Sequence, residues 1–338
     1  MEGGAIVNDQ LGGKATAAKP RDATAPMTFG ESYLAVPDLF PARQSGEPWG
    51  PERIVLRFAG NAYVCEGLSP NQATGLRAKF GSLARDTLDG PRPAVVVRIF
   101  RVASSDFVVD EREWEFEFDL DYARDALGVA GFHMMARLDF VPRLSAALWT
   151  SEDDLLVERS IFENLLRIVV AYHMLEQGGV LLHSAGVADE RGARVFFGPS
   201  GAGKSTIARL GIASRRSVLS DDMNALRLER GALVVEKLPF SGDFGGSADA
   251  VQGFFPVRGL YRLEKGAAYA TRTLRPASAI AALLECAPFV NRNPFRYEEL
   301  MRNLEDLHER APVQVLTFAP NESAWEGLEA RHVPSQVA

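Results

Sequence analysis

The stretch "GPSGAGKST" at residues 198–206 decides the fold, because its glycines and its lysine follow the pattern of a phosphate-binding loop. Gly198, Gly203, Lys204 and Ser205 occupy the fixed positions of G-x-x-x-x-G-K-[ST]. Such a loop turns backbone N–H groups toward phosphate oxygens, and glycine permits the close approach that this requires. The apolar run "RVFF" precedes the stretch, and the helical sequence "KSTIARLGIAS" continues from it. We therefore predict a strand, a phosphate loop and a helix, in that order.

Each residue type in this loop has an expected task. Lys204 supplies a positive charge to the β and γ phosphates, and the Ser205 hydroxyl ligates Mg²⁺. The N-terminus of the following helix adds a partial positive charge. The residues predicted to bind the nucleotide here are Gly198, Pro199, Ser200, Gly201, Ala202, Gly203, Lys204, Ser205 and Thr206. The loop recognises phosphates and not bases, so ATP, GTP and pyrophosphate all stay open as donors.

The sequence around the loop predicts a fold of the α/β class. Strand-like and helix-like segments alternate after the loop, which indicates an α/β nucleotide-binding core over residues 153–338. Residues 28–152 contain several β-branched and aromatic runs, among them "WEFEFDLD", and predict a β-rich α+β accessory domain. Residues 1–27 are poor in large apolar side chains, so we expect a disordered tail.

The composition of the 338-residue chain excludes some classes of partner. The net charge is −7, whereas nucleic-acid binding needs a basic surface, so we expect no nucleic-acid partner. No apolar run approaches the roughly 20 residues of a membrane span, and the first residues lack the pattern of a secretory signal. The two cysteines, Cys65 and Cys286, form neither a disulfide framework nor a metal-binding spacing. We therefore expect a reduced, cytoplasmic location.

Two adjacent acids follow the loop. Asp221 and Asp222 end the apolar run "SVLS", and Asp221 lies 16 residues after Ser205. A carboxylate near a phosphate loop is needed to hold Mg²⁺, and a second one can accept a hydroxyl proton. We predict that Asp221 is the general base and that Asp222, with Ser205, binds the metal, although the two roles can be reversed. The alternative interpretation is a solvated turn at the end of a strand.

A histidine precedes the loop. His183 stands in "LLHSAGV", 21 residues before Lys204, on the strand before the loop strand. If the two strands are neighbours, the imidazole lies near the Mg²⁺–phosphate region, so we count His183 with Asp221 and Lys204 as candidate catalytic residues. The alternative is a histidine whose hydrogen bonds are satisfied in the core.

These three motifs in this order resemble bacterial HPr kinase/phosphorylase, and more distantly ATP-dependent phosphoenolpyruvate carboxykinase. The resemblance covers residues 178–315 and implies the P-loop core of that family. It implies that one aspartate binds Mg²⁺ with Ser205, that the other is the base, and that His183 assists. The segment "PVRGLYRLEKG" resembles the family's Arg-Gly-Leu segment, which makes Arg258 a candidate phosphate contact. The alternative for Arg258 is a solvated residue at a strand edge.

The sequence also departs from this family. Pro256 and Val257 stand where the family has a glutamate, and "YRLEKG" replaces a glycine-rich stretch that is associated with phosphorolysis. The resemblance therefore does not extend to a reverse, phosphorylase activity, which stays open, and the chain looks more like the loose group of HPr-kinase-related proteins. The resemblance also implies a homo-oligomer, without fixing its number of subunits.

A glycine-rich stretch, "LPFSGDFGG" at residues 238–246, is a candidate flap over the nucleotide or the acceptor. It contains Pro239, Gly242, Gly245 and Gly246, and Asp243 would face the site. A plain surface turn is the alternative.

The sequence thus predicts a kinase that uses ATP and Mg²⁺ to phosphorylate a hydroxyl group, with serine of a protein or peptide as the expected acceptor. Two alternatives stay open: a nucleotide-binding regulatory module without transfer activity, and a small-molecule kinase. A transporter-type ATPase is disfavoured because the chain lacks a Ser-Gly-Gly-Gln signature.

Overall fold

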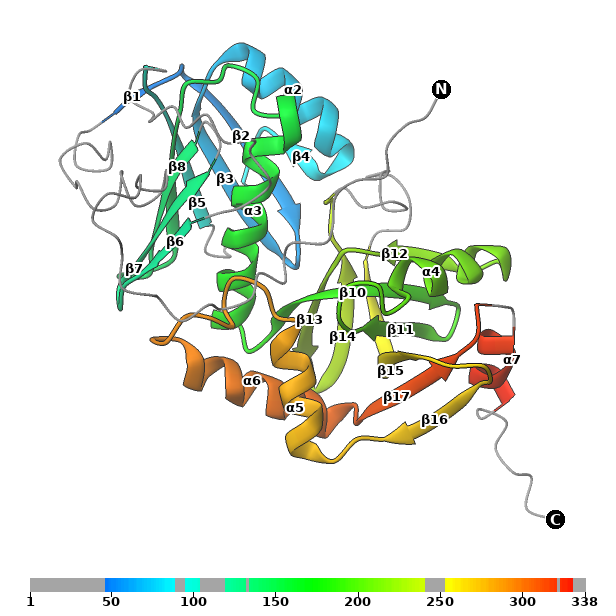
Figure 1. Ribbon diagram of the computed structural model, residues 1–338. Helices are drawn as coiled ribbons and strands as arrows, with labels where there is room; N and C mark the ends of the chain where they lie inside the picture. Colours follow the sequence, from blue (N-terminus) through cyan, green and yellow to red (C-terminus); the bar gives the residue numbers. More distant parts are fainter. Residues whose placement is uncertain are drawn as a thin grey trace, which may run out of the picture. The chain divides into compact units, whose positions relative to one another are not determined.

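The computed structural model describes residues 46–88, 95–103, 119–131, 134–240, 253–320 and 323–330. The chain is mixed α/β with two sheets, and it divides into two compact units, Met1–Val169 and Val170–Ala338 (Figure 1). Helix α3 (Val157–Glu176) crosses the point of division. The expected tail at residues 1–27 and most of "WEFEFDLD" lie outside the described residues, and the expected domain boundary after residue 152 stays a prediction.

The first unit contains a nine-stranded sheet in the order β4-β2-β3-β5-β9-β8-β7-β6, with β1 paired to β5. The strands are β1 (Glu47–Pro48), β2 (Glu52–Phe58), β3 (Asn61–Leu68), β4 (Ala84–Arg85), β5 (Val95–Arg101), β6 (Asp119–Tyr122), β7 (Ala126–Gly131), β8 (Met134–Asp139) and β9 (Ser145–Thr150). Most pairs are antiparallel, but β3, β5 and β9 are parallel neighbours.

Helix α2 (Pro70–Phe80) of this unit starts at a capping box and is followed by a short 3₁₀ turn, η2 (Gly81–Leu83). The Ser69 hydroxyl accepts from the Gln72 N–H at 3.1 Å, and the Gln72 side chain accepts from the Ser69 N–H at 3.0 Å. The buried carboxylate of Glu163, on α3, contacts Lys79 at 3.1 Å and Arg167 at 3.0 Å. Such partners offset the cost of burying a charge, so this cluster ties α2 to α3.

The second unit contains an eight-stranded sheet in the order β11-β10-β13-β14-β15-β17-β16, in which β12 pairs with β10 and β11 also pairs with β15. The strands are β10 (Val180–Asp189), β11 (Gly192–Phe197), β12 (Ser217–Ser220), β13 (Met223–Glu229), β14 (Ala232–Lys237), β15 (Phe254–Lys265), β16 (Ala270–Thr273) and β17 (Val313–Phe318). The helices are α4 (Lys204–Ala213), α5 (Pro276–Glu285), α6 (Tyr297–Arg310) and α7 (Ser323–Ala330).

Two long strands of this unit change partners along their length. Residues 180–183 of β10 pair with β13, whereas residues 184–189 pair with β11. Residues 254–256 of β15 pair with β14, and β15 then runs parallel to β11 from Val257 onward. His183 is therefore the last residue of β10 that pairs with β13, at the place where the strands part.

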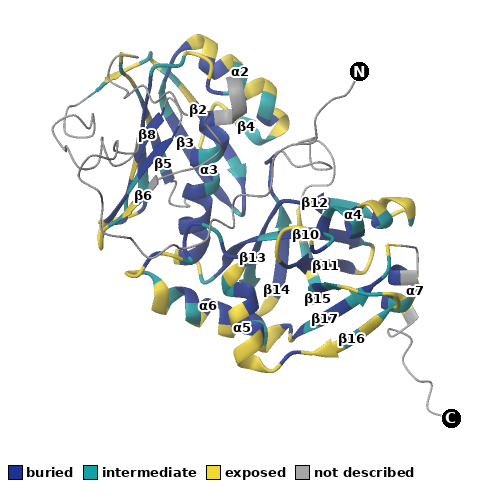
Figure 2. Ribbon diagram, in the orientation of Figure 1, coloured by how far each residue is buried: buried dark blue, intermediate teal, exposed yellow. Residues whose placement is uncertain are grey.

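The core of the second unit lies between this sheet and the pair α4 and α7. Phe196 of β11 stacks on Tyr261 with ring centroids 5.4 Å apart and meets Trp325 of α7 edge-on at 5.5 Å. All six residues of β11 are buried, as Figure 2 shows for the centre of the sheet. The loop after β11 therefore begins at the end of a rigid, fully packed strand.

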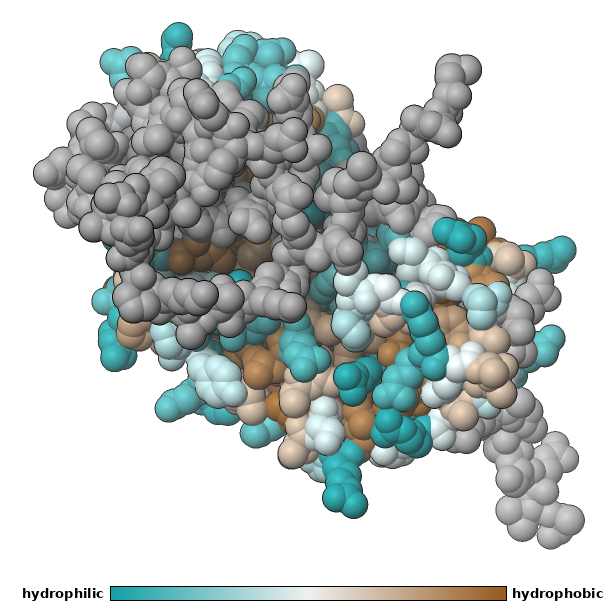
Figure 3. Space-filling view, in the orientation of Figure 1, coloured by the Kyte–Doolittle hydropathy of each residue, from teal (hydrophilic) through white to brown (hydrophobic). Residues whose placement is uncertain are grey.

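On the face seen in Figure 3, hydrophilic and hydrophobic side chains are interspersed over the second unit. The large apolar side chains that are exposed among the described residues are Leu88, Val141, Ile212, Phe254, Phe295 and Tyr297. None of the helices in the described ranges combines the length and the apolarity that a membrane span requires.

We predict an acid-sensitive contribution of His173, which lies on α3 and is 5% exposed. Burial lowers its pKa from 6.5 to about 4, so the unfolded chain binds this proton at a higher pH than the folded chain does. The free energy of unfolding therefore decreases as the pH falls from 6.5 toward 4. At pH 5 this decrease is about 2 kcal/mol relative to neutral pH. Urea unfolding at pH 8 and pH 5 should show this loss in the wild type and a smaller one in His173→Gln. An equal loss in both proteins would contradict the assignment.

Candidate active site

The loop at residues 198–203 joins the buried strand β11 to helix α4, which begins at Lys204. Gly201 and Gly203 adopt positive φ angles of 71° and 111°, which glycine reaches without steric cost. Gly203 also lies close to β17, because a Cβ atom added to it would lie 3.1 Å from the Phe318 ring. The geometry thus depends on glycine at these two positions. Pro199, Ser200 and Gly201 are exposed at the surface of the loop.

The side chain of Lys204 is buried beneath the loop, and the residue is 8% exposed. Its ammonium group donates to the carbonyl oxygens of Gly198 at 3.1 Å and of Pro199 at 3.5 Å. Burial lowers the pKa of Lys204. Three nearby groups act in the opposite direction on that pKa: Cys286, Asp222 and Asp221. The ammonium group is therefore within electrostatic reach of both aspartates.

The two aspartates join β12 to β13, and both strands run antiparallel to β10. Ser220 is paired with Gly186 and Met223 with His183, so Asp221 and Asp222 stand opposite the residues between them. The Ser184 N–H donates to the Asp222 carbonyl at 2.9 Å. Both acidic residues are buried, with exposures of 6% for Asp221 and 2% for Asp222. Buried carboxylates of this kind need positive or hydrogen-bonding neighbours.

A group of small polar residues fixes this acidic turn. The Ser220 hydroxyl accepts from the N–H groups of Asp222 at 3.2 Å and of Met223 at 3.1 Å. The side-chain amide of Asn224 donates to the carbonyl of Ser184 at 2.7 Å and to its hydroxyl at 3.0 Å. The sequence interpretation missed these residues. The available signal was a polar residue inside each of two apolar strands, "LLHSAGV" and "MNALRL".

His183 lies beside the acidic turn. Its Nε2 atom is 3.7 Å from Oδ1 of Asp222, and its side chain is 17% exposed. That distance is too long for a hydrogen bond and suits an ion pair when the imidazole is protonated. Its backbone N–H donates to the Cys286 carbonyl at 2.8 Å. The structure therefore brings His183 and Asp222 close together.

Cys286 is a further residue of the site that the sequence interpretation missed. It follows α5 and is 6% exposed. Burial raises the pKa of its thiol, while the charge of Lys204 and the Gly198 N–H lower it. The Cys286 thiol thus lies near Gly198 and Lys204, and the Cys286 carbonyl accepts a hydrogen bond from β10 at His183. A single cysteine far along the chain carries no sequence pattern that indicates this place.

The structure places Arg258 at the end of β11 that is opposite the loop. Arg258 lies beside Gly192, the first residue of β11, because a Cβ atom added to Gly192 would be 3.1 Å from its Cγ atom. The loop follows Phe197, at the other end of that strand and about 16 Å away at the usual rise. Phe197 is instead paired with Arg262, four residues after Arg258. Arg262 is therefore the arginine of β15 that stands beside the start of the loop.

The residues of the site suit a magnesium–nucleotide complex by their chemistry. Asp221 and Asp222 provide carboxylate oxygens, and Ser205 provides a hydroxyl in the first turn of α4. Among the described residues, no group of three or more His, Cys, Asp or Glu side chains is placed to hold a metal ion. Mg²⁺ in phosphotransfer sites is usually held by one or two carboxylates together with substrate phosphates. The candidate flap, from Gly242 to Gly246 with Asp243, lies outside the described residues.

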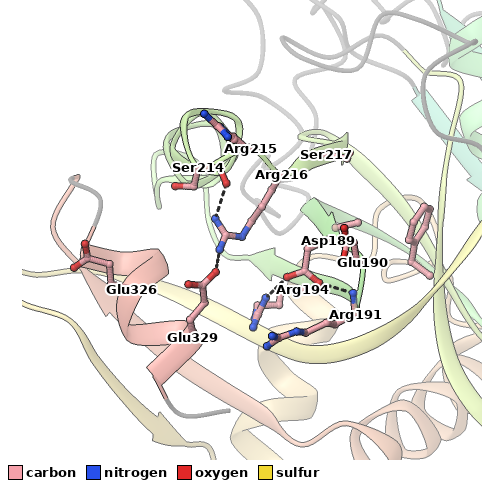
Figure 4. A pocket seen from close by; sticks show the side chains of 12 residues that line it. Asp189, Glu190, Arg191, Arg194, Ser214, Arg215, Arg216, Ser217, Glu326 and Glu329 are labelled. Atoms are coloured by element: carbon pink, nitrogen blue, oxygen red, sulfur yellow. Dashed lines mark hydrogen bonds and ion pairs between the residues drawn. The ribbon is translucent and has the colours of Figure 1, made fainter. Parts of the chain in front are cut away.

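A cavity of about 860 Å³ lies elsewhere in the second unit, between the β10–β11 turn, the end of α4 and α7 (Figure 4). The guanidinium carbons of Arg194 and Arg216 lie 5.9 and 4.4 Å from the centroid of the Trp325 ring. Each is paired with a carboxylate, Arg194 with Asp189 at 3.4 Å and Arg216 with Glu329 (Figure 4). This cavity lies at the end of β11 that is remote from the loop, so it is separate from the candidate active site.

The likeness to known proteins that the comparisons give is weak. No family model matches the chain, and no curated protein matches it. Among solved structures, the chain is similar to the Hpr(Ser) kinase/phosphatase from Coxiella burnetii, with 14% sequence identity and a TM-score of 0.27. The match covers 45% of this chain and 95% of that chain. A similarity this low does not assign the chain to a family.

Proposed function

We propose that the chain is a kinase that transfers the γ-phosphoryl group of ATP to a hydroxyl acceptor with the help of Mg²⁺. One observation carries the proposal: Lys204, beneath a glycine-rich loop, lies within electrostatic reach of Asp221 and Asp222, and His183 stands 3.7 Å from Asp222. A phosphate-binding cation, two acids and an imidazole are the groups that phosphoryl transfer uses. The motif resemblance to HPr kinase supports the same reaction.

Each residue then has a task. The loop amides and Lys204 bind and orient the phosphates, which accounts for most of the expected acceleration. Asp221 accepts the proton of the acceptor hydroxyl, and Asp222 and Ser205 are the residues that would hold Mg²⁺. The metal, when bound, neutralises charge on the phosphates. His183 orients the Asp222 carboxylate, which it faces across the place where β10 leaves β13.

The acceptor that we propose is a serine hydroxyl on a protein or peptide. The motif resemblance to the HPr-kinase-related group is the reason for this choice. A small-molecule kinase uses the same groups in the site, and a nucleotide-binding regulatory module uses the loop alone. Transfer of a labelled phosphate distinguishes the three.

The test is incubation of the purified chain with a cell extract and ATP labelled in its γ-phosphate. We expect label in a protein that releases phosphoserine on acid hydrolysis, and none when the label is in the α-phosphate. Label in the acid-soluble fraction would replace the protein acceptor by a small molecule. ATP binding without any transferred label would contradict the kinase and favour a regulatory module.

A further inference from the structure

Strand β15 passes directly beside the first residue of the phosphate loop. It is parallel to β11, and Phe197, the last residue of β11, is paired with Arg262. A Cβ atom added to Gly198 would lie 3.5 Å from the Leu263 carbonyl oxygen. In open sheets with parallel strands, ligands bind at the carboxyl ends of those strands, and Arg262 lies near the carboxyl end of β15.

The side chain of Arg262 belongs to the face of the sheet opposite α4 and α7. Tyr261, its neighbour, stacks on Phe196 within the core beneath those helices. Because side chains alternate along a strand, Arg262 and Phe197 lie on the other face. The Cys286 thiol is near Arg262, because the positive charges of Lys204 and Arg262 both lower the pKa of this thiol. Two cations therefore approach the same thiol, one from the loop helix and one from β15.

The guanidinium group of Arg262 is not committed to an acid in the described part of the chain. Among those residues it makes no ion pair and no side-chain hydrogen bond, whereas Glu264 on the same strand pairs with Arg272 at 3.1 Å. The residue is half-buried. A cation in such a position has donors available for a ligand, and arginine presents them as a planar fork that fits phosphate oxygens.

We propose that Arg262 is a second phosphate-binding cation, which contacts the γ-phosphate and makes the site prefer nucleoside triphosphates over diphosphates. The proposal rests on the proposed function, because it places a nucleotide on the loop. Lys204 and the loop amides reach the phosphates from α4, and Arg262 reaches them from β15. A diphosphate fills the loop and leaves the arginine without its partner, so only the triphosphate gains this contact.

The test compares Arg262→Gln with Arg258→Gln, which removes the same charge four residues away on the same strand. The affinities of ATP and of ADP are measured by calorimetry on each purified variant. We expect Arg262→Gln to weaken ATP binding by about tenfold to a hundredfold and to leave ADP binding unchanged. Arg262→Lys should restore part of the ATP affinity, and Arg258→Gln should bind both nucleotides like the wild type.

Other outcomes separate this inference from the function on which it rests. Equal losses of ATP and ADP affinity in Arg262→Gln, or an unchanged ATP affinity, would overturn the role of Arg262 and leave the kinase proposal standing. The same loss in Arg258→Gln would overturn it too, since a general effect of charge would explain both. Failure of the wild type to bind either nucleotide would overturn both proposals. Thermal unfolding of each variant checks that it is folded.

Discussion

Replacing Lys204 with alanine is expected to abolish ATP binding, with a rise of at least about a hundredfold in the Kd. The side chain is buried beneath the loop, and its ammonium group lies 3.1 Å from the Gly198 carbonyl. When a nucleotide binds, this cation is the charge that meets the β and γ phosphates, and alanine leaves only the backbone amides. Calorimetry with ATP and with ADP measures the effect, and both nucleotides should be affected.

Two further variants make this result interpretable. Lys265→Ala removes an exposed lysine at the end of β15 and should bind ATP like the wild type. Lys204→Met keeps most of the buried volume and removes the charge, so it distinguishes lost phosphate contact from a collapsed loop. A Lys204→Ala variant that unfolds at the wild-type temperature and binds ATP with wild-type affinity would refute the phosphate loop.

The order of strand, loop and helix at residues 192–213 could be predicted from the sequence because its signals are local. The phosphate-loop pattern specifies glycines, a lysine and a hydroxyl within a few residues, and the apolar run before it and the helical run after it define the strand and the helix. That β10 and β11 are neighbours was predictable by one further step, whereas the meeting of His183 with Asp222 depends on the pairing of His183 with Met223 of β13. The structure pairs β10 with both β11 and β12.

The non-local part of the site could not be predicted, because it depends on register. The Arg-Gly-Leu segment directed attention to Arg258, but which residue of β15 stands beside the loop depends on its pairing with β11, including a shift between Ala193 and Arg194. Cys286 enters the site through tertiary packing of α5. The change of partners within β10 at His183 also has no sequence pattern. The alternation of side chains along a strand does not depend on which neighbouring strand it pairs with.

Replacing Asp221 with asparagine is expected to stop phosphoryl transfer while leaving ATP affinity close to that of the wild type. Asparagine keeps the size and the hydrogen-bonding capacity of the buried side chain, but it cannot accept the proton of the acceptor hydroxyl. Loss of a general base lowers the rate by about a hundredfold to ten-thousandfold. The measurements are ATP affinity by calorimetry and turnover by release of labelled phosphate to the acceptor, with exposed Asp306→Asn as the control.

Asp222→Asn separates the two acids. Asp222 is the more buried of the pair and faces His183, so its loss should weaken the Mg²⁺ dependence of ATP binding as well as turnover. If Asp222→Asn keeps that dependence and Asp221→Asn loses it, the two roles are exchanged, because the metal ligand is then the earlier residue. Wild-type turnover in Asp221→Asn would show that Asp221 is not the general base. Wild-type turnover in both variants would mean that the acidic turn only shapes the strands around it, and the kinase proposal would lose the observation on which it depends.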